Sequence, residues 1–130
     1  MIGYITLGTN DLARSARFYD ALLAELGATR ALEEDNFVTW ISGAGGPMLG
    51  VIKPFDEEQA TVGNGVMVAL SVESRDQVDR LYQKAMELGA ADEGLPGERQ
   101  TGFYVGYFRD LDGNKLAVYI TDPALLETSE

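Results

Sequence analysis

RDLDGNKLAV, residues 109–118, is the stretch that decides how this chain folds. Its aspartates and glycine supply the local hydrogen bonds and the positive φ that a tight turn requires. After the turn, Leu116, Val118 and Ile120 alternate with other side chains, which is typical of a half-buried strand. The stretch therefore predicts a turn that leads directly into a strand.

A second copy of this pattern lies earlier in the chain. FVTWISGAGGPMLGV at 37–51 aligns without a gap with YVGYFRDLDGNKLAV at 104–118, an offset of 67 residues (104 minus 37). Aromatic residues, valines, turn glycines and the Leu-x-Val endings coincide. We infer an internal repeat, in which Trp40 and Tyr107 take equivalent positions.

Each copy begins with a strand and an amphipathic helix. Asn10 or Asp11 is expected to cap the first helix, and SRDQ at 74–77 is a capping box for the second. The helices should end at Gly27 and Gly89. Strands are expected at 2–7, 28–32, 37–41, 48–52, 66–72, 102–108 and 115–120. The polar end of the chain, residues 122–130, should be loosely held.

The predicted fold class is α+β, with two βαβββ repeats that form a curved mixed sheet around a cleft and carry helices outside. We expect a single domain over residues 1–130. Its first repeat spans about 1–53, a linker about 54–63, and its second repeat about 64–121. Each repeat leaves sheet edges and an apolar cleft lip, so a homodimer is expected.

The charge of the chain limits its partners. The 130 residues carry a net charge of −11, so nucleic acid and anionic membrane surfaces are not expected to bind. Such a charge chiefly supports solubility, and it could also attract a cationic ligand. No apolar run is long enough to cross a bilayer and no signal peptide is evident, so a cytoplasmic location is expected.

The chain contains neither His nor Cys. The commonest general base, the commonest metal ligand and all thiol chemistry are therefore excluded. Acid–base catalysis would have to use a tyrosine or a carboxylate, and the sequence does not identify a catalytic residue.

Strand alternation suggests which side chains face the cleft. If Ile5, Val68 and Leu116 face the helices, then the opposite face carries the following residues: Tyr4, Gly50, Met67, Ala117 and Tyr119. The aromatic residues Trp40 and Tyr107 would suit a pocket wall, or they could instead pack on the helices.

The repeat and three segments, NDLARSARFYDALL, GNGVMVALSV and YFRDLDGNKLAVY, resemble the vicinal oxygen chelate superfamily of glyoxalases, bleomycin resistance proteins and extradiol dioxygenases. The resemblance covers about residues 1–122. In metal-dependent members, a metal is held by positions that match Tyr4, Gly50, Met67 and Ala117. None of these is a His, Glu or Gln, so the resemblance implies this fold without its metal or any other cofactor.

Two readings of function follow from the resemblance. The first is a metal-free protein that binds a small molecule, as in sequestration of a drug or metabolite. The alternative is a divergent lyase, isomerase or dioxygenase relative, similar to lactoylglutathione lyase.

Other motifs have structural explanations. Asp110-x-Asp112-x-Asn114 begins like a calcium loop but lacks its later glycine and glutamate, so a turn is expected. GAGGP at 43–47 should be a hairpin loop, and the acidic runs at 33–35 and 56–58 should be solvated turns. Tyr19 and Tyr82 should pack in the core.

Overall fold

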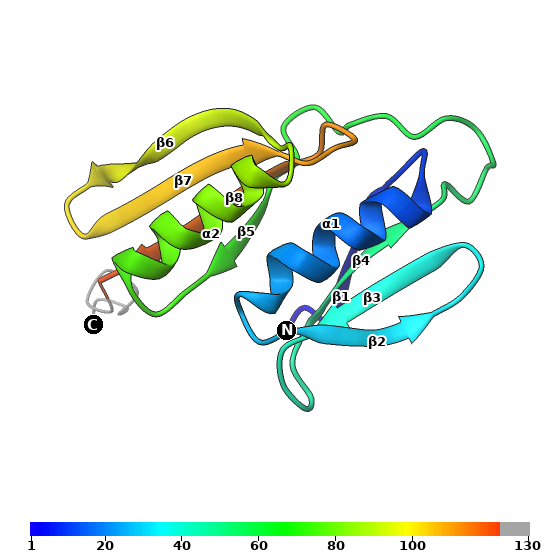
Figure 1. The fold of residues 1–130 in the computed structure, drawn as a ribbon, viewed down its shortest axis with the longest axis horizontal. Coiled ribbons are helices and arrows are strands. Elements are labelled where there is room, and N and C mark those ends of the chain that lie inside the picture. Colours follow the sequence, from blue (N-terminus) through cyan, green and yellow to red (C-terminus); the bar gives the residue numbers. More distant parts are fainter. Residues whose placement is uncertain (123–130) are drawn as a thin grey trace. The chain divides into compact units, whose positions relative to one another are not determined.

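The computed structural model describes residues 1–122, so the expectation for the end of the chain falls, apart from Asp122, outside the described residues. The chain divides into two compact units (Figure 1). Unit 1 comprises Met1–Val66 together with Leu111–Asn114, and unit 2 begins at Met67 and contains the remainder. No helix within residues 1–122 is long and apolar enough to cross a membrane.

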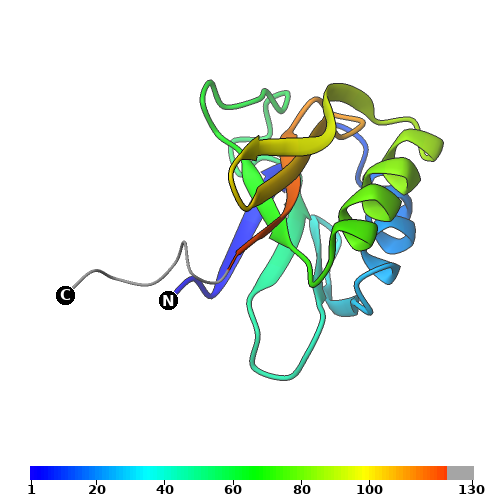
Figure 2. The ribbon, with the colours of Figure 1, turned by 90° about the vertical axis from the view of Figure 1, so that its left-hand side faces the viewer.

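Unit 1 is a four-stranded mixed sheet with a helix on one face (Figures 1 and 2). The strand order is β1-β4-β3-β2, with β1 parallel to β4 and the other neighbours antiparallel. The elements are β1 (Tyr4–Gly8), α1 (Leu12–Ala24), β2 (Thr29–Glu33), β3 (Phe37–Ile41) and β4 (Met48–Ile52).

The helix α1 forms where its cap and its apolar stripe predict. The Asp11 carboxylate accepts a hydrogen bond from the backbone N–H of Arg14. The buried face of the helix carries Phe18, Tyr19 and Leu22, which are at most 3% exposed. Burial of this face against the sheet stabilises a helix of 13 residues that would be marginal alone.

Unit 2 repeats the same order of elements (Figure 1). Its sheet has the order β5-β8-β7-β6, with β5 parallel to β8. The Ser74 hydroxyl accepts from the N–H of Gln77, as in a capping box, and the Gln77 side chain reaches back to accept from the N–H of Glu73, one residue before the cap. The elements are β5 (Val68–Ser71), α2 (Arg75–Glu87), β6 (Ala91–Gln100), β7 (Phe103–Arg109) and β8 (Lys115–Thr121). The α+β class and the two βαβββ repeats are confirmed, as two four-stranded sheets.

The strand β6 had no counterpart among the strands located from the sequence. Its sequence, ADEGLPGERQ, contains two glycines, a proline and several charges, which are unfavourable for an interior strand. These residues are tolerated because β6 is an edge strand that pairs only with β7, with several register shifts. It is also tied to α2, since the Tyr82 hydroxyl donates to Asp92 at 2.7 Å and Arg75 bonds Glu98 at 2.6 Å.

The gapless alignment of the two repeats is wrong by one residue where it aligns β3 with β7. Trp40 lies opposite Leu49, whereas Phe108 lies opposite Leu116. Leu49 and Leu116 are 67 positions apart, but Trp40 and Phe108 are 68 apart, because the loop of the first hairpin is one residue longer. Phe108, rather than Tyr107, is therefore the structural equivalent of Trp40.

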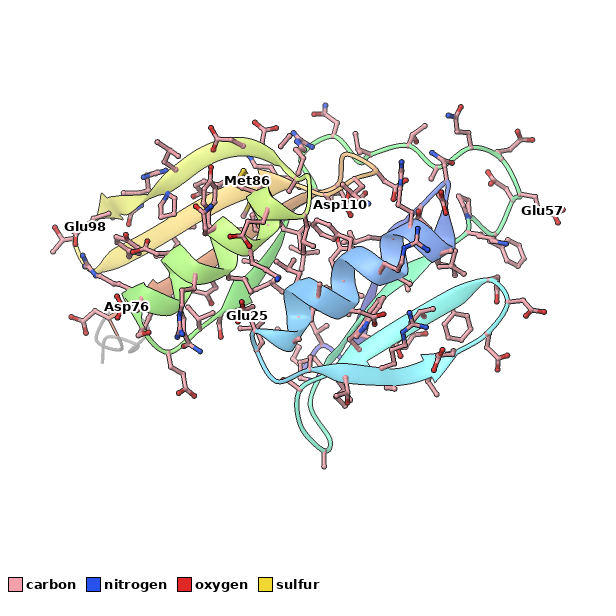
Figure 3. All side chains as sticks on the ribbon, in the orientation of Figure 1. Glu25, Glu57, Asp76, Met86, Glu98 and Asp110 are labelled. Atoms are coloured by element: carbon pink, nitrogen blue, oxygen red, sulfur yellow. The ribbon has the colours of Figure 1, made fainter. Side chains whose placement is uncertain are left out.

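The turn at residues 111–114 belongs to unit 1. Gly113 has a φ of 90°, which favours glycine. The Asp112 carboxylate accepts from the Thr9 hydroxyl at 2.7 Å and from the Asn10 N–H at 3.0 Å. Asn114 donates to the carbonyl of Gly8 at 2.9 Å. Figure 3 shows Asp110 at the end of β7, where the chain enters this turn. The segment is a structural turn, as expected.

Candidate functional site

The sheet face of unit 2 that lies opposite α2 contains a hollow of about 350 Å³. We call it the open-face pocket. Strands β7 and β8 supply most of its lining, and residues at the ends of β5 and β6 complete it. Its lining residues are Met67, Ala69, Gln100, Phe103, Val105, Tyr107, Ala117, Tyr119 and Thr121.

Cross-strand pairing explains why these side chains share one face. Tyr107 lies opposite Ala117, and Val105 lies opposite Tyr119. Residues two apart along a strand share a face, so the pocket side extends along both strands. The intervening residues Leu116 and Val118 are completely buried on the side of α2.

The pocket has an apolar floor and aromatic walls. Val105 and Ala117 are each 1% exposed and form its base. The rings of Phe103 and Tyr119 stack at a centroid distance of 5.6 Å with an interplanar angle of 26°. Met67 is 43% exposed and offers a flexible thioether to a ligand.

Two cations lie near the Tyr107 ring. The Lys115 ammonium lies 5.3 Å from the ring centroid and the Arg99 guanidinium carbon lies 5.7 Å from it. Elsewhere on β7, Arg109 forms an ion pair with Glu93 of β6. Hydrogen bonding and charge from Arg109 hold the pKa of the Glu93 carboxyl below its ordinary value.

Two other predicted site residues, Tyr4 and Gly50, belong to unit 1. Tyr4 is 67% exposed at the start of β1. Gly50 is buried, and a Cβ at this position would lie 3.0 Å from the Thr39 methyl group. The Thr39 hydroxyl in turn donates to the Met48 sulfur at 3.6 Å and accepts from the Leu32 N–H. This face is therefore closely packed around Gly50.

Trp40 does not line a ligand pocket. It is 2% exposed, its ring lies 5.7 Å from that of Tyr19 on α1, and its indole N–H donates to Asp20 at 2.8 Å. The expectation that Trp40 forms a cleft wall is wrong, and the alternative of packing on the helix is correct. The one-residue difference in hairpin length moves its side chain to the other face of the sheet. Tyr19 and Tyr82 lie in the core, as expected.

Of the seven predicted site residues, the open-face pocket brings together Met67, Tyr107, Ala117 and Tyr119. Sequence reasoning missed Phe103, Val105 and Thr121, although the same alternation extended along β7 and β8 would have found them. It also missed Gln100, and Arg99 beside the Tyr107 ring, for which no signal existed because β6 itself was not located.

A second, larger hollow of about 450 Å³ lies in unit 1. It is formed mainly by the loop that follows β4, and Figure 3 shows Glu57 on the outer bend of that loop. Its lining residues are Thr9, Asn10, Asn36, Lys53, Pro54, Phe55, Glu57 and Glu58. None of the predicted site residues contributes to it, so the open-face pocket remains the better candidate despite its smaller volume.

The four positions that match the metal ligands of metal-dependent relatives do not fit a metal. Gly50 and Ala117 have no donor atom, and the tight contact with Thr39 leaves little room for a ligating side chain at position 50. Met67 offers only a soft thioether and Tyr4 a phenol. Within residues 1–122, no three His, Cys, Asp or Glu side chains are grouped so that they could hold a metal ion.

Comparison with known proteins agrees with this architecture. A family model described as Glyoxalase/Bleomycin resistance protein/Dioxygenase superfamily matches residues 1–118. A glyoxalase/bleomycin resistance protein from Albidiferax ferrireducens T118 is 30% identical, with a TM-score of 0.84 over 92% of this chain and 97% of that one. The hypothetical protein SA1046 from S. aureus is 28% identical, with a TM-score of 0.68 over 92% and 96%.

A lactoylglutathione lyase from Agrobacterium tumefaciens is 21% identical, with a TM-score of 0.69 over 92% of each chain, and this likeness shows the fold alone. No protein of curated function matches the sequence significantly. The family model and the relative from Albidiferax, which span nearly the whole chain, show that this protein belongs to the glyoxalase/bleomycin resistance protein/dioxygenase superfamily.

Proposed function

We propose that this chain is a metal-independent member of its superfamily that binds a small molecule in the open-face pocket. Sequestration of a drug or metabolite is the concrete form of this function. The observation that carries the proposal is that the family's metal-ligand positions lack suitable donor atoms here, while one of them, Ala117, still lines a pocket. Ala117 occupies a metal-ligand position of the family, and here it forms the floor of an apolar hollow.

The lining of the pocket supports binding by apolar area. Ligand pockets are concave, mostly apolar and aromatic, and carry few polar groups, which fix orientation. The stacked Phe103–Tyr119 pair and Met67 offer apolar contact, while Gln100 and the tyrosine hydroxyls offer hydrogen bonds. No proton transfer or bond cleavage is needed for such a function.

The alternative is a divergent lyase, isomerase or dioxygenase relative. The lactoylglutathione lyase with the same fold supports it only at the level of architecture. The residues of this chain argue against it, because Gly50 and Ala117 cannot bind a metal and the chain has no His.

We further propose that the protein works as a homodimer in the cytoplasm. Each sheet has edge strands, and several large apolar side chains are exposed near them, including Ile2, Tyr4, Val66 and Met67. The absence of Cys agrees with a reducing compartment.

The proposal is tested by elemental analysis of protein purified without chelator, followed by a thermal-shift ligand screen with and without divalent metals. We expect no stoichiometric Zn, Ni, Fe or Mn, and ligand-induced shifts that a chelator does not change. One equivalent of such a metal per chain, lost in Met67→Ala or Tyr4→Phe, would contradict the proposal. So would ligand shifts that appear only when metal is added.

A further inference from the structure

We propose that the open-face pocket selects an aromatic ligand that carries a negative charge, with a carboxylate as the simplest case. This inference rests on the proposed function and adds the chemical class of the ligand. Its basis is the pair of cations at the Tyr107 ring, which come from different strands, Arg99 from β6 and Lys115 from β8.

The Arg99 side chain lies in a notch formed by two glycines. A Cβ at position 97 would lie 2.9 Å from one terminal guanidinium nitrogen of Arg99, and a Cβ at position 94 would lie 3.2 Å from the other. The same added atom at position 94 would lie 3.0 Å from the ring of Tyr107. The guanidinium also donates to the carbonyl of Leu95 at 2.6 Å, which holds it beside the pocket wall.

Lys115 approaches the same ring from β8. It shares the pocket face of its strand with Ala117, because the two residues are two positions apart. Glu93 is the acidic group near this cation, and its carboxylate is engaged by Arg109. No ion pair of Arg99 or Lys115 is found within residues 1–122, so both cations can interact with an incoming anion.

The apolar part of the ligand has a matching surface. The Phe103–Tyr119 stack, Val105 and Ala117 line the pocket. The two cations are not lining residues themselves and lie against the ring of Tyr107, which is part of the lining. A flat aromatic ring can contact these groups while its carboxylate faces the guanidinium and the ammonium. The volume of about 350 Å³ is sufficient for a ligand of one or two rings.

The local charge of the pocket therefore opposes the charge of the whole chain. A net charge of −11 alone would favour a cationic ligand through long-range attraction. Such attraction is screened over about 10 Å at moderate salt, whereas groups in direct contact with the ligand act at short range. The groups that contact the ligand at this pocket should consequently favour an anionic ligand over a cationic one.

The test uses three probes that share one ring system: 2-naphthoate, 2-naphthamide and 2-naphthylmethylammonium. Isothermal titration calorimetry on the full chain should show the tightest binding for naphthoate. An affinity at least about threefold above that of the neutral amide is expected from two partly exposed charge contacts. The advantage should shrink as salt is raised from about 20 to about 200 mM.

Arg99→Gln and Lys115→Gln should each weaken naphthoate binding while leaving naphthamide binding unchanged. The unchanged amide affinity would show that the pocket is intact in each variant. Arg80→Gln is the matched control, because Arg80 is exposed on α2 of the same unit and its loss changes the net charge equally. It should leave the affinity for all three probes unchanged.

The outcomes separate this inference from the proposed function. Binding of the amide or the ammonium probe as tightly as naphthoate would overturn the inference and leave the proposed function standing. Equal losses of naphthoate affinity in Arg80→Gln and Arg99→Gln would also overturn it, since only overall charge would then matter. If no probe binds, the proposed aromatic pocket fails and the inference fails with it.

Discussion

At the scale of single residues, Ala117 is the position where a larger side chain is expected to fill the open-face pocket. It lies at the floor of the open-face pocket and is 1% exposed. Its neighbour Leu116 is fully buried on the opposite face, under α2. Adjacent residues of this strand thus lie on opposite faces of the sheet, one at the pocket and one in the core.

Ala117→Trp is expected to fill the pocket and abolish probe binding with little loss of stability. The new ring can occupy existing space on the open face, whereas Leu116→Trp would overpack the core at a cost of about 1–3 kcal/mol. Calorimetry with 2-naphthoate and urea unfolding of both variants check this. If Ala117→Trp unfolds the protein as readily as Leu116→Trp, the assignment of the pocket face is wrong.

Asp20 is a second residue with a sharply defined role, since its carboxylate binds two partners. It accepts from the Trp40 indole at 2.8 Å and from Arg30 at 2.9 and 2.7 Å. Hydrogen bonds from Arg30 hold the pKa of Asp20 below its ordinary value, partly opposed by burial and assisted by Trp40. Asp20→Ala should cost about 1–3 kcal/mol, because the buried indole N–H loses its acceptor.

The Asp20 effect should depend on pH. The pKa of Asp20 is lower in the folded state than in the unfolded state. The ionised carboxylate therefore stabilises the fold above about pH 4. This contribution is lost as the pH falls through the folded-state pKa. Asp20→Asn keeps an oxygen for Trp40 but loses the charge. Its stability deficit relative to the wild type should therefore shrink between about pH 6 and pH 3. Urea unfolding followed by fluorescence of Trp40, the only tryptophan, measures this. A deficit that grows as pH falls would contradict the assignment.

At the scale of elements, the turn between β7 and β8 does more than reverse the chain. The Asp112 side chain is 4% exposed and accepts hydrogen bonds from Thr9 and Asn10, the residues that precede α1. Arg14 lies 3.6 Å from the same carboxylate. Asp112, which resembles a ligand position of a calcium loop, thus binds protein groups within unit 1.

Asp112→Ala is expected to destabilise the protein by about 2–3 kcal/mol, since a nearly buried hydroxyl and a backbone N–H lose a charged acceptor. Asp35→Ala, at an exposed position in the turn after β2, is the control and should change stability by less than about 0.5 kcal/mol. Chemical denaturation of the two variants compares them directly. Equal stabilities would show that the turn is held by its backbone alone.

At the scale of the whole molecule, each repeat leaves open sheet edges that favour association with a second copy. Symmetric dimers are the commonest solution to such exposed surface. We expect sedimentation equilibrium to give twice the chain mass of 14.1 kDa at micromolar concentration. Observation of only the 14.1 kDa species at the highest attainable concentration would argue decisively against a dimer.

The sequence by itself determined both helices, every strand except β6, and the repetition of these elements. The β3–β4 and β7–β8 hairpins, both helices and the helix caps follow from local chemistry, as Asp11, Ser74 and Gly113 illustrate. It also placed Met67, Ala117 and Tyr119 on one face of the sheet, because alternation has a period of two wherever a strand is regular. The lack of donors at the family's metal positions was likewise evident from residue identity alone.

Only the tertiary structure decided the register between paired strands. It also decided which side chains from different strands come together. Trp40 faces the helix rather than the pocket side because the loop of the β3–β4 hairpin is one residue longer than that of the β7–β8 hairpin. A shift of one residue exchanges the two faces of a strand. The strand β6 exists through its pairing with β7 and its contacts with α2, despite an unfavourable composition. The cations at Tyr107 meet only through this pairing, since Arg99 and Lys115 lie on different strands and no local pattern connects them.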